Sequence, residues 1–295
     1  MILIYGTANF KNGYGINRVK LSNRNINIIL NFLIKKKIKF LDVASTYATR
    51  ANNFDDYNNF KVFSKLKKIP RNISKNDYEK LKKFILSEVY KDLKNFKVNQ
   101  LEGYYVHNIS DVLKYKKKLY QIFNELKKKK IVKKIGLSFY NLGEEKKSFN
   151  YFKPDVIQVP FNIFSEDKNN YLLKKIKKKG IKIFARSIFL QGLILKPTEK
   201  IHKYFKGIGK NLLTIDKIFG YNNTLKKIEL TIKKIEKNKN FDGIIFSGDT
   251  TKEINFFLKI VNTKNKNNKI SSVLNNISKV NIKELDPRKW PKKIT

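Results

Sequence analysis

Short apolar segments and longer amphipathic segments alternate along almost the whole chain, and this alternation constrains the fold more than any other feature. Each apolar segment is typical of a buried strand, and each longer segment repeats apolar residues at helical spacing. Such alternation indicates β/α units around a parallel sheet. Eight strands are predicted: Ile2 to Gly6, a strand ending at Asp42, Lys61 to Lys65, Leu101 to His107, Val132 to Ser138, Asp155 to Phe161, Ile181 to Ser187, and Gly243 to Gly248.

Eight strands separated by helices are the number that a (β/α)8 barrel needs, so the predicted fold class is an α/β protein with a (β/α)8 TIM barrel. A doubly wound open sheet is the alternative. No convincing GxGxxG motif lies between a strand and a helix, where a dinucleotide-binding fold of that kind carries one. The barrel is expected to occupy residues 1–262. Residues 263–295 are expected to form a Lys/Asn-rich segment and a tail that Trp290 docks.

Local signals predict where several helices begin and end. Ser22 and Ser74 are the predicted N-caps of the first and second major helices, because a serine side chain can accept a hydrogen bond from a free helix N–H group. Gly180 is a predicted C-terminal cap. Residues 190–221 lack a clear period and are expected to form a long irregular connection.

The formal net charge of +41 suggests an anionic partner such as a nucleic acid. However, only six of the 65 basic residues are arginine, the residue whose planar fork suits phosphates and guanine edges. The lysines gather in runs such as KKIKKKG and ELKKKK on the expected outer faces of helices, a pattern typical of a solvated surface. A nucleic-acid partner is therefore disfavoured.

The absence of cysteine excludes disulfides, thiolate metal sites and a thiol nucleophile, and no metal site is predicted. No apolar run approaches the roughly 18 residues of a membrane span. The start, MILIYGTANF, reads as a strand rather than a signal peptide. A cytoplasmic protein without a membrane partner is expected, and the sequence does not indicate an oligomeric state.

Polar residues end three consecutive predicted strands. Asp42, Lys65 and His107 stand at these ends, and Tyr47 follows Asp42 in the loop. In a barrel the carboxyl ends of the strands meet at one rim, so these side chains are expected to converge. A neighbouring ammonium lowers the pKa of a phenol, and a buried lysine needs a carboxylate partner to stay charged. The four residues together predict a general acid that protonates a carbonyl oxygen.

A series of segments also resembles the aldo-keto reductase family, in the family's own order. YGTANF followed by GYG is similar to its opening strand and loop, and FLDVASTY keeps the spacing of its D-T-A-x-x-Y signature. FSKL and YYVHN resemble the strands that carry its lysine and histidine. KKIGLSFYN, DVIQVPFNIF, IFARSIFLQGLIL and IIFSGDTTKEI resemble its fifth to eighth strands. The segment RSIFLQG is most similar to short bacterial members found with surface-polysaccharide genes.

The resemblance implies an NAD(P)H-dependent oxidoreductase that reduces an aldehyde or ketone to an alcohol by hydride transfer. NADPH is the family's usual cofactor and NADH is the alternative. Tyr47 would be the general acid, Lys65 would lower the pKa of its phenol, and Asp42 would hold Lys65. His107 would orient the carbonyl group. A small-molecule carbonyl substrate is implied, and the bacterial subgroup suggests a sugar or polysaccharide precursor.

The resemblance also implies a set of cofactor-binding residues. Ser138 and Gln158 match positions that bond the nicotinamide carboxamide, and Arg186 stands where the family usually has an aromatic that stacks on the nicotinamide ring. The other positions lie in the seventh-strand loop, which covers the pyrophosphate, and at the start of the last barrel helix, near the adenosine phosphate: Ser187, Phe189, Gly192, Gly248, Thr250, Thr251 and Lys252.

The sequence departs from the family pattern at several of these places. The loop ATRANNFDDYNNF replaces the usual glycine turn after Tyr47, and Phe139 replaces an asparagine. Asp249 stands in an eighth-strand loop that lacks the K-S-x-x-x-R pattern of strict NADPH users, and it would repel a 2′-phosphate. These departures favour one alternative: a catalytically decayed barrel that binds a nucleotide or a protein partner.

Overall fold

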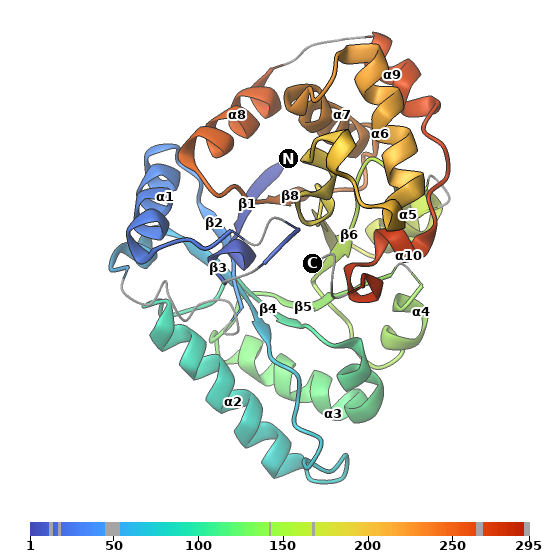
Figure 1. Cartoon of the computed structure of the whole chain (residues 1–295). Helices are drawn as coiled ribbons and strands as arrows, with labels where there is room; N and C mark the ends of the chain where they lie inside the picture. The colour runs from blue at the N-terminus through green and yellow to red at the C-terminus, as the bar shows by residue number, and fades with distance from the viewer. Residues whose placement is uncertain are drawn as a thin grey trace.

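The computed structural model describes residues 1–11, 14–16, 19–44, 54–141, 143–166, 169–263 and 268–291, and within them eight parallel strands close into a barrel (Figure 1). Ile2 pairs with Gly243 and Tyr5 with Phe246, so the last strand is hydrogen-bonded to the first. The predicted (β/α)8 fold is confirmed. The strands are β1 (Ile2–Gly6), β2 (Phe40–Asp42), β3 (Lys61–Leu66), β4 (Gly103–Val106), β5 (Ile135–Ser138), β6 (Val156–Pro160), β7 (Lys182–Arg186) and β8 (Gly243–Phe246).

Helices surround the barrel and cover its outer face (Figure 1). They are α1 (Asn23–Lys35), α2 (Tyr78–Asn95), α3 (Ile109–Lys128), α4 (Glu145–Ser148), α5 (Asn169–Lys178), α6 (Lys206–Phe219), α7 (Thr224–Lys237), α8 (Thr251–Asn262), α9 (Asn268–Asn275) and α10 (Ile282–Leu285). As predicted, Ser22 caps α1 by accepting a hydrogen bond from the N–H of Asn25. In the described chain no helix is both long enough and apolar enough to cross a bilayer.

The cap predicted for the second long helix is wrong. α2 begins at Tyr78, and the Asp77 carboxylate accepts the hydrogen bond from Lys80 N–H. Ser74 instead accepts a hydrogen bond from Asn76 N–H in the preceding turn. Aspartate and serine are about equally good N-caps, so the residue nearer the first helical turn takes the role.

Aromatic side chains from β3, β4 and β7 fill the inside of the barrel. Phe63 meets Phe184 edge-on, with ring centroids 5.6 Å apart, and meets Tyr105 at 6.0 Å. Ile4 belongs to the same buried cluster. A Cβ atom at Gly103 would lie 2.6 Å from the Phe63 ring, so only glycine fits beside this ring. Close packing of this kind fixes the relative positions of the strand ends.

The segment after β7 is more ordered than the sequence predicted. The apolar face of α6 buries Ile208, Leu212 and Ile215 in a second hydrophobic cluster beside the barrel core. The prediction of a wholly irregular connection over residues 190–221 is therefore wrong, because tertiary burial stabilises a helix whose sequence is unfavourable. Three 3-10 helices precede α6: η3 (Leu190–Leu195), η4 (Thr198–Lys200) and η5 (Lys203–Phe205).

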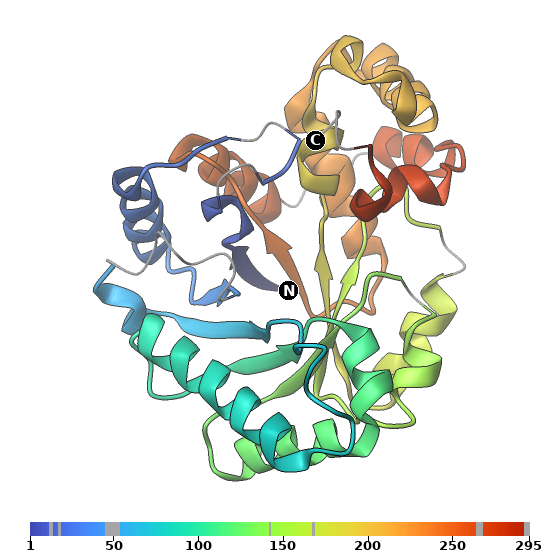
Figure 2. The ribbon, with the colours of Figure 1, turned by 60° about the horizontal axis from the view of Figure 1, so that its bottom comes forward.

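The C-terminal segment docks on this second cluster, as predicted for Trp290. The Trp290 ring is buried and meets Phe205 edge-on at 4.9 Å, while its indole N–H donates to the Glu284 carbonyl oxygen at 2.9 Å. The Glu284 carboxylate accepts hydrogen bonds from the N–H groups of Gly207 and Ile208. α10 consequently lies against the start of α6, at the end of the barrel toward which β7 points (Figure 2). A division at residue 262 stays a prediction.

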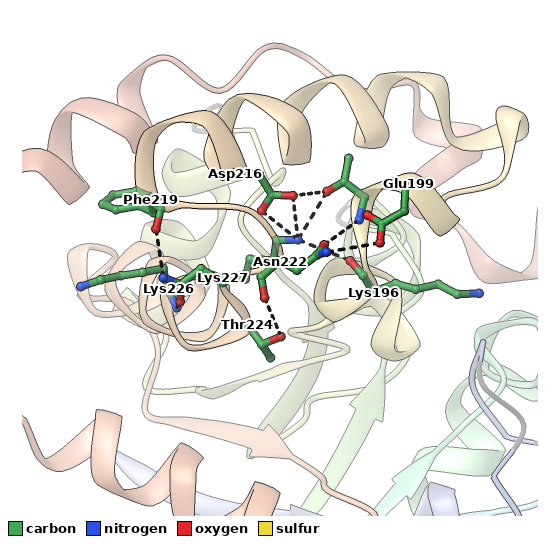
Figure 3. Close-up of polar contacts among 10 residues, drawn as sticks. Lys196, Glu199, Asp216, Phe219, Asn222, Thr224, Lys226 and Lys227 are labelled. Atoms are coloured by element: carbon green, nitrogen blue, oxygen red, sulfur yellow. Dashed lines mark hydrogen bonds and ion pairs between the residues drawn. The ribbon is translucent and has the colours of Figure 1, made fainter.

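A buried ion pair joins the segment after β7 to the next helix (Figure 3). Lys227 Nζ of α7 lies 3.2 Å from Asp216 Oδ1 of α6, and both side chains are almost fully buried. Thr198 Oγ1 donates to Asp216 Oδ2 at 2.5 Å, and Lys227 Nζ also donates to the Lys196 carbonyl oxygen at 3.4 Å. These contacts hold η4, α6 and α7 together.

Candidate active site

Asp42 and Lys65 form a buried ion pair at the C-terminal ends of neighbouring strands. Lys65 Nζ lies 2.5 Å from Asp42 Oδ2 and also donates to the Val43 carbonyl oxygen at 3.2 Å. Only 3% of the Lys65 side chain and 9% of the Asp42 side chain are exposed. Parallel pairing of β2 with β3 brings both residues to the same rim. The structure thus joins two of the four residues predicted for catalysis.

Asp42 is held from two sides. Its Oδ2 faces Lys65, and its Oδ1 accepts a hydrogen bond from Gln158 Nε2 at 2.5 Å. Burial lowers the pKa of Lys65, while attraction and hydrogen bonding to Asp42 oppose this shift. The positive charge of Arg186 lowers the Lys65 pKa further. Asp42 is therefore the group that does most to favour the charged ammonium, and the more distant Asp92 adds to this effect.

His107 follows β4 at the same rim and is half-buried. Its ring stacks near that of Tyr140, with centroids 6.2 Å apart and planes at 24°. Burial lowers the pKa of His107 to about 3, and repulsion from Lys65 and Arg186 contributes. The imidazole is therefore neutral at physiological pH and offers one N–H donor and one acceptor.

A tyrosine from the loop after β1 lies near the Asp42–Lys65 pair. Tyr47, the predicted general acid, lies outside the described residues. Tyr14, from the loop after β1, lies close enough to Asp42, Arg186 and Tyr140 for their charges to influence its pKa, which burial raises. The sequence pattern GYG marked this loop but did not identify Tyr14 as a neighbour of Asp42.

Ser138 and Gln158 are partners in the register of β5 and β6. Both side chains are fully buried, and across the described chain neither Ser138 Oγ nor Gln158 Oε1 has a hydrogen-bond partner. Buried polar atoms rarely stay unpaired, so these two fit a ligand group that both donates and accepts, such as a carboxamide. The next residue, Phe139, is fully buried and offers the site its carbonyl oxygen only.

Arg186 ends β7 and faces this rim. Its Nη2 donates to the Phe139 carbonyl oxygen at 2.7 Å, and its Nη1 donates to Ser187 Oγ at 3.1 Å. Its guanidinium carbon lies 5.1 Å from the Tyr140 ring centroid. Ser187 itself adopts a left-handed conformation with φ 53°, which turns the chain away from the strand. The structure therefore groups Arg186 with His107 through Tyr140.

The predicted cofactor-binding residues of the seventh-strand loop contact other parts of the protein. Phe189 meets Phe257 of α8 edge-on at 6.1 Å, and Gly192 has φ 91° within η3. The Gln191 carbonyl oxygen accepts a hydrogen bond from Ile16 N–H at 3.0 Å. This bond ties the loop after β7 to the loop after β1.

Acidic side chains occupy the start of α8. Thr250 caps the helix by accepting from Glu253 N–H, and the Glu253 carboxylate accepts from Asp249 N–H at 2.7 Å. The Gly248 carbonyl oxygen accepts hydrogen bonds from the Tyr5 hydroxyl at 2.7 Å and from Asn9 Nδ2 at 2.9 Å. The first turn also contains the remaining predicted residues, Thr251 and Lys252.

Arg288 is a rim residue that sequence reasoning missed. Its guanidinium carbon lies 4.0 Å from the Tyr140 ring centroid, the same ring that Arg186 contacts. Its Nε and Nη2 atoms donate to the two oxygens of Asp286, at 2.9 and 2.7 Å. The tail around Arg288 has no periodicity, so no local signal placed it beside β5.

Comparisons with known proteins agree with this architecture. The family model described as the aldo/keto reductase family matches residues 2–270. No curated protein matched in a sequence search. The holo form of aldo-keto reductase AKR11C1 from Bacillus halodurans is 14% identical over 94% of this chain and 92% of its own, with a TM-score of 0.66.

Two further solved structures share the fold. Glycerol dehydrogenase AKR11B4 from Gluconobacter oxydans is 13% identical, with a TM-score of 0.64 over 93% of this chain and 90% of its own. A Gox0644 variant in complex with NADPH is 12% identical, with a TM-score of 0.65 over 93% of this chain and 88% of its own. At such identities the likeness shows the barrel alone, whereas the family model spans most of the sequence. The chain therefore belongs to the aldo/keto reductase family of oxidoreductases.

Proposed function

We propose that the protein reduces an aldehyde or ketone to an alcohol with NAD(P)H, with Tyr47 as the general acid. The observation that carries this proposal is the buried Asp42–Lys65 ion pair at the rim where His107 also lies. Burying a lysine costs free energy, and the carboxylate of Asp42 on the neighbouring strand favours its charged form. A structural ion pair alone gives no reason for a neutral, half-buried histidine at the next strand end.

The chain's own residues divide the proton chemistry among them. The Tyr47 hydroxyl donates its proton to the carbonyl oxygen, and the Lys65 ammonium stabilises the phenolate that remains. Asp42 keeps Lys65 charged, and Gln158 fixes the orientation of Asp42. His107, neutral because burial lowers its pKa to about 3, donates a hydrogen bond that orients the carbonyl group.

The residues near the rim fit a nicotinamide cofactor. Ser138 Oγ and Gln158 Oε1 are buried without partners in the described part of the chain, and a carboxamide would satisfy both. Bound NAD(P)H would supply the hydride that reduces the carbonyl carbon. The solved Gox0644 variant is in complex with NADPH, which supports NADPH as the first cofactor to test. Asp249 and Glu253 at the start of α8 make NADH the necessary comparison.

The substrate is a small carbonyl compound. The RSIFLQG segment resembles reductases found with surface-polysaccharide genes, and one solved relative is a glycerol dehydrogenase. A substrate panel should therefore include glyceraldehyde and open-chain sugars beside simple aromatic aldehydes.

A cofactor-binding protein without turnover is the second candidate. Phe139 favours it, because a fully buried apolar side chain stands where the family pattern has an asparagine. In that case the protein would bind NADPH or NADH and oxidise neither with any aldehyde of the panel.

The deciding experiment combines cofactor titration with turnover. NADPH and NADH are titrated by fluorescence, and NAD(P)H oxidation is then followed with the aldehyde panel. We expect Tyr47→Phe to lower kcat/KM by roughly 10²- to 10⁴-fold while cofactor still binds. Tyr221→Phe, at an exposed tyrosine, is the matched control and should keep wild-type turnover. Full activity of Tyr47→Phe would show that another group is the acid.

A further inference from the structure

Arg186 carries a positive charge at the barrel mouth, and no acidic residue in the described ranges forms an ion pair with it. Its hydrogen bonds go to the Phe139 carbonyl oxygen and the Ser187 hydroxyl, which are neutral acceptors. Among the described residues no carboxylate lies within ion-pair distance of it, and its buried Nε has no partner. An arginine has five N–H donors, so the fork is only partly used.

The other two cations of the mouth are already paired with carboxylates. Lys65 is matched by Asp42 at 2.5 Å, and Arg288 is matched by both oxygens of Asp286. His107 is neutral because burial lowers its pKa to about 3. Of Lys65, Arg288 and Arg186, only Arg186 therefore has no ion-pair partner in the described part of the chain.

Tyr140 holds the guanidinium in place. The Arg186 carbon lies 5.1 Å from the Tyr140 ring centroid, and the bond from Nη2 to the Phe139 carbonyl oxygen fixes the plane of the fork. Stacking of this kind pre-organises an arginine, so less side-chain freedom is lost when a ligand binds. The Tyr140 ring centroid lies 6.2 Å from that of His107. The Tyr140 ring therefore contacts both the Arg186 guanidinium and the residue proposed to orient the carbonyl group.

We propose that the substrate carries an anionic group, a carboxylate or a phosphate, which binds the free edge of the Arg186 guanidinium beside Tyr140. This inference rests on the proposed function and adds the charge class of the substrate to it. A planar guanidinium binds either anion through paired hydrogen bonds, and the neighbouring Arg288 adds a weaker attraction because Asp286 already neutralises it.

The experiment compares benzaldehydes that carry an anionic or a neutral group at the para position. With NADPH, kcat/KM is measured for 4-carboxybenzaldehyde, for its neutral isostere 4-carbamoylbenzaldehyde, and for 4-formylphenyl phosphate. We expect the wild type to prefer one of the anions by roughly tenfold or more over the amide. Arg186→Gln should lower this ratio by roughly 10- to 100-fold, and Arg186→Lys should retain part of it.

Matched arginine variants locate the effect. Arg288→Gln should lower the ratio less than Arg186→Gln does, because its fork is taken by Asp286. Arg24→Gln, at an exposed position of α1, should leave the ratio at the wild-type value. The ratio is compared, rather than the rate, so that any general loss of turnover cancels.

Two outcomes separate this inference from the proposed function. Reduction of the neutral amide as fast as both anions would overturn the inference and leave the reductase standing. An unchanged ratio in Arg186→Gln with weaker NADPH binding would overturn it too, by assigning Arg186 to the cofactor. If no aldehyde is reduced, calorimetry on NADPH-loaded protein compares benzoate with benzamide. A preference for benzoate that Arg186→Gln removes would support the anion site, and equal binding would overturn it.

Discussion

Asp92 shows that this chain tolerates a buried acid away from the barrel mouth. Its Oδ2 accepts a hydrogen bond from Ser64 Oγ at 2.6 Å, whereas its Oδ1 has no partner among the described residues. Burial raises the pKa of Asp92 to about 7, and the Ser64 hydrogen bond opposes this shift. The carboxyl group therefore takes up a proton on folding at mildly acidic pH.

The raised pKa makes a prediction about stability. Between about pH 4, where an unfolded aspartate titrates, and about pH 7, the folded state binds more protons, so the free energy of unfolding falls as pH rises. Asp92→Asn should therefore stabilise the protein more at pH 8 than at pH 5, with a difference of roughly 1–3 kcal/mol. Urea unfolding at the two pH values measures this difference.

Ser64→Ala is the matched variant for that measurement. It removes the hydroxyl that lowers the pKa of Asp92, so the loss of stability with rising pH should become larger than in the wild type. A gain from Asp92→Asn of the same size at pH 5 and pH 8 would contradict the raised pKa.

For individual residues of the site, the sequence predicted those that lie at strand ends. It missed those that reach the site from loops and from the C-terminal tail. Asp42 and Lys65 each end or lie in a short strand, and strand periodicity with parallel pairing brings such residues to one rim. Tyr14 and Arg288 reach the rim from irregular segments. Their positions depend on packing between segments far apart in the chain, which no local pattern encodes.

At the scale of elements, α6 is the helix that the sequence concealed. Gly207 and Gly209 stand in its first turn, and each glycine costs about 1 kcal/mol in a helix relative to alanine. The Glu284 carboxylate accepts from Gly207 N–H and Ile208 N–H, so a side chain from the tail satisfies the free end of the helix. A Cβ at Gly207 would lie 3.0 Å from Glu284 Oε1, which is one reason why glycine suits this position.

The ion pair between α6 and α7 predicts a large effect of a small change. Asp216→Asn removes the charge that faces the buried Lys227 ammonium, and breaking a buried pair from one side typically costs about 3–5 kcal/mol. We expect the denaturant midpoint to fall accordingly. Replacing both residues, Asp216→Leu with Lys227→Met, should restore much of the loss because no unpaired charge stays buried.

A second, more exposed ion pair on α7 provides the control for the buried pair of Asp216 and Lys227 (Figure 3). Lys226→Ala, which breaks the more exposed ion pair with Glu229 on the same helix, is the matched control and should cost less than about 1 kcal/mol. An equally small effect of Asp216→Asn would show that the buried pair does not hold η4, α6 and α7 together.

For the whole molecule, the net charge of +41 is the dominant long-range feature. Uncompensated charge of one sign destabilises a compact state by self-repulsion, and 0.1 M salt largely screens the repulsion between exposed charges more than about 10 Å apart. Raising NaCl from about 0.02 to 0.3 M should therefore raise Tm by at least about 3 °C, which corresponds to roughly 2 kcal/mol for a chain of this length. Differential scanning fluorimetry measures the shift.

A neutral osmolyte at equal osmolality is the control for that experiment. A neutral osmolyte cannot screen charge, so its effect on Tm comes from solvation alone. This effect is subtracted from the change in Tm that NaCl causes. A Tm that stays flat or falls with NaCl after this correction would mean that the lysines are locally compensated rather than mutually repelling.

Closure of the sheet by Ile2 and Gly243 has a consequence for how the protein is made. A ribosome adds roughly 5–20 residues per second, so β1 emerges on the order of 10–50 s before its second neighbour exists. During that interval the edge of β1 that will face β8 has unpaired N–H and C=O groups, the kind of edge that recruits other chains. The nascent chain must therefore pass through translation with an open sheet, and a chaperone that covers exposed strand edges would act during this interval.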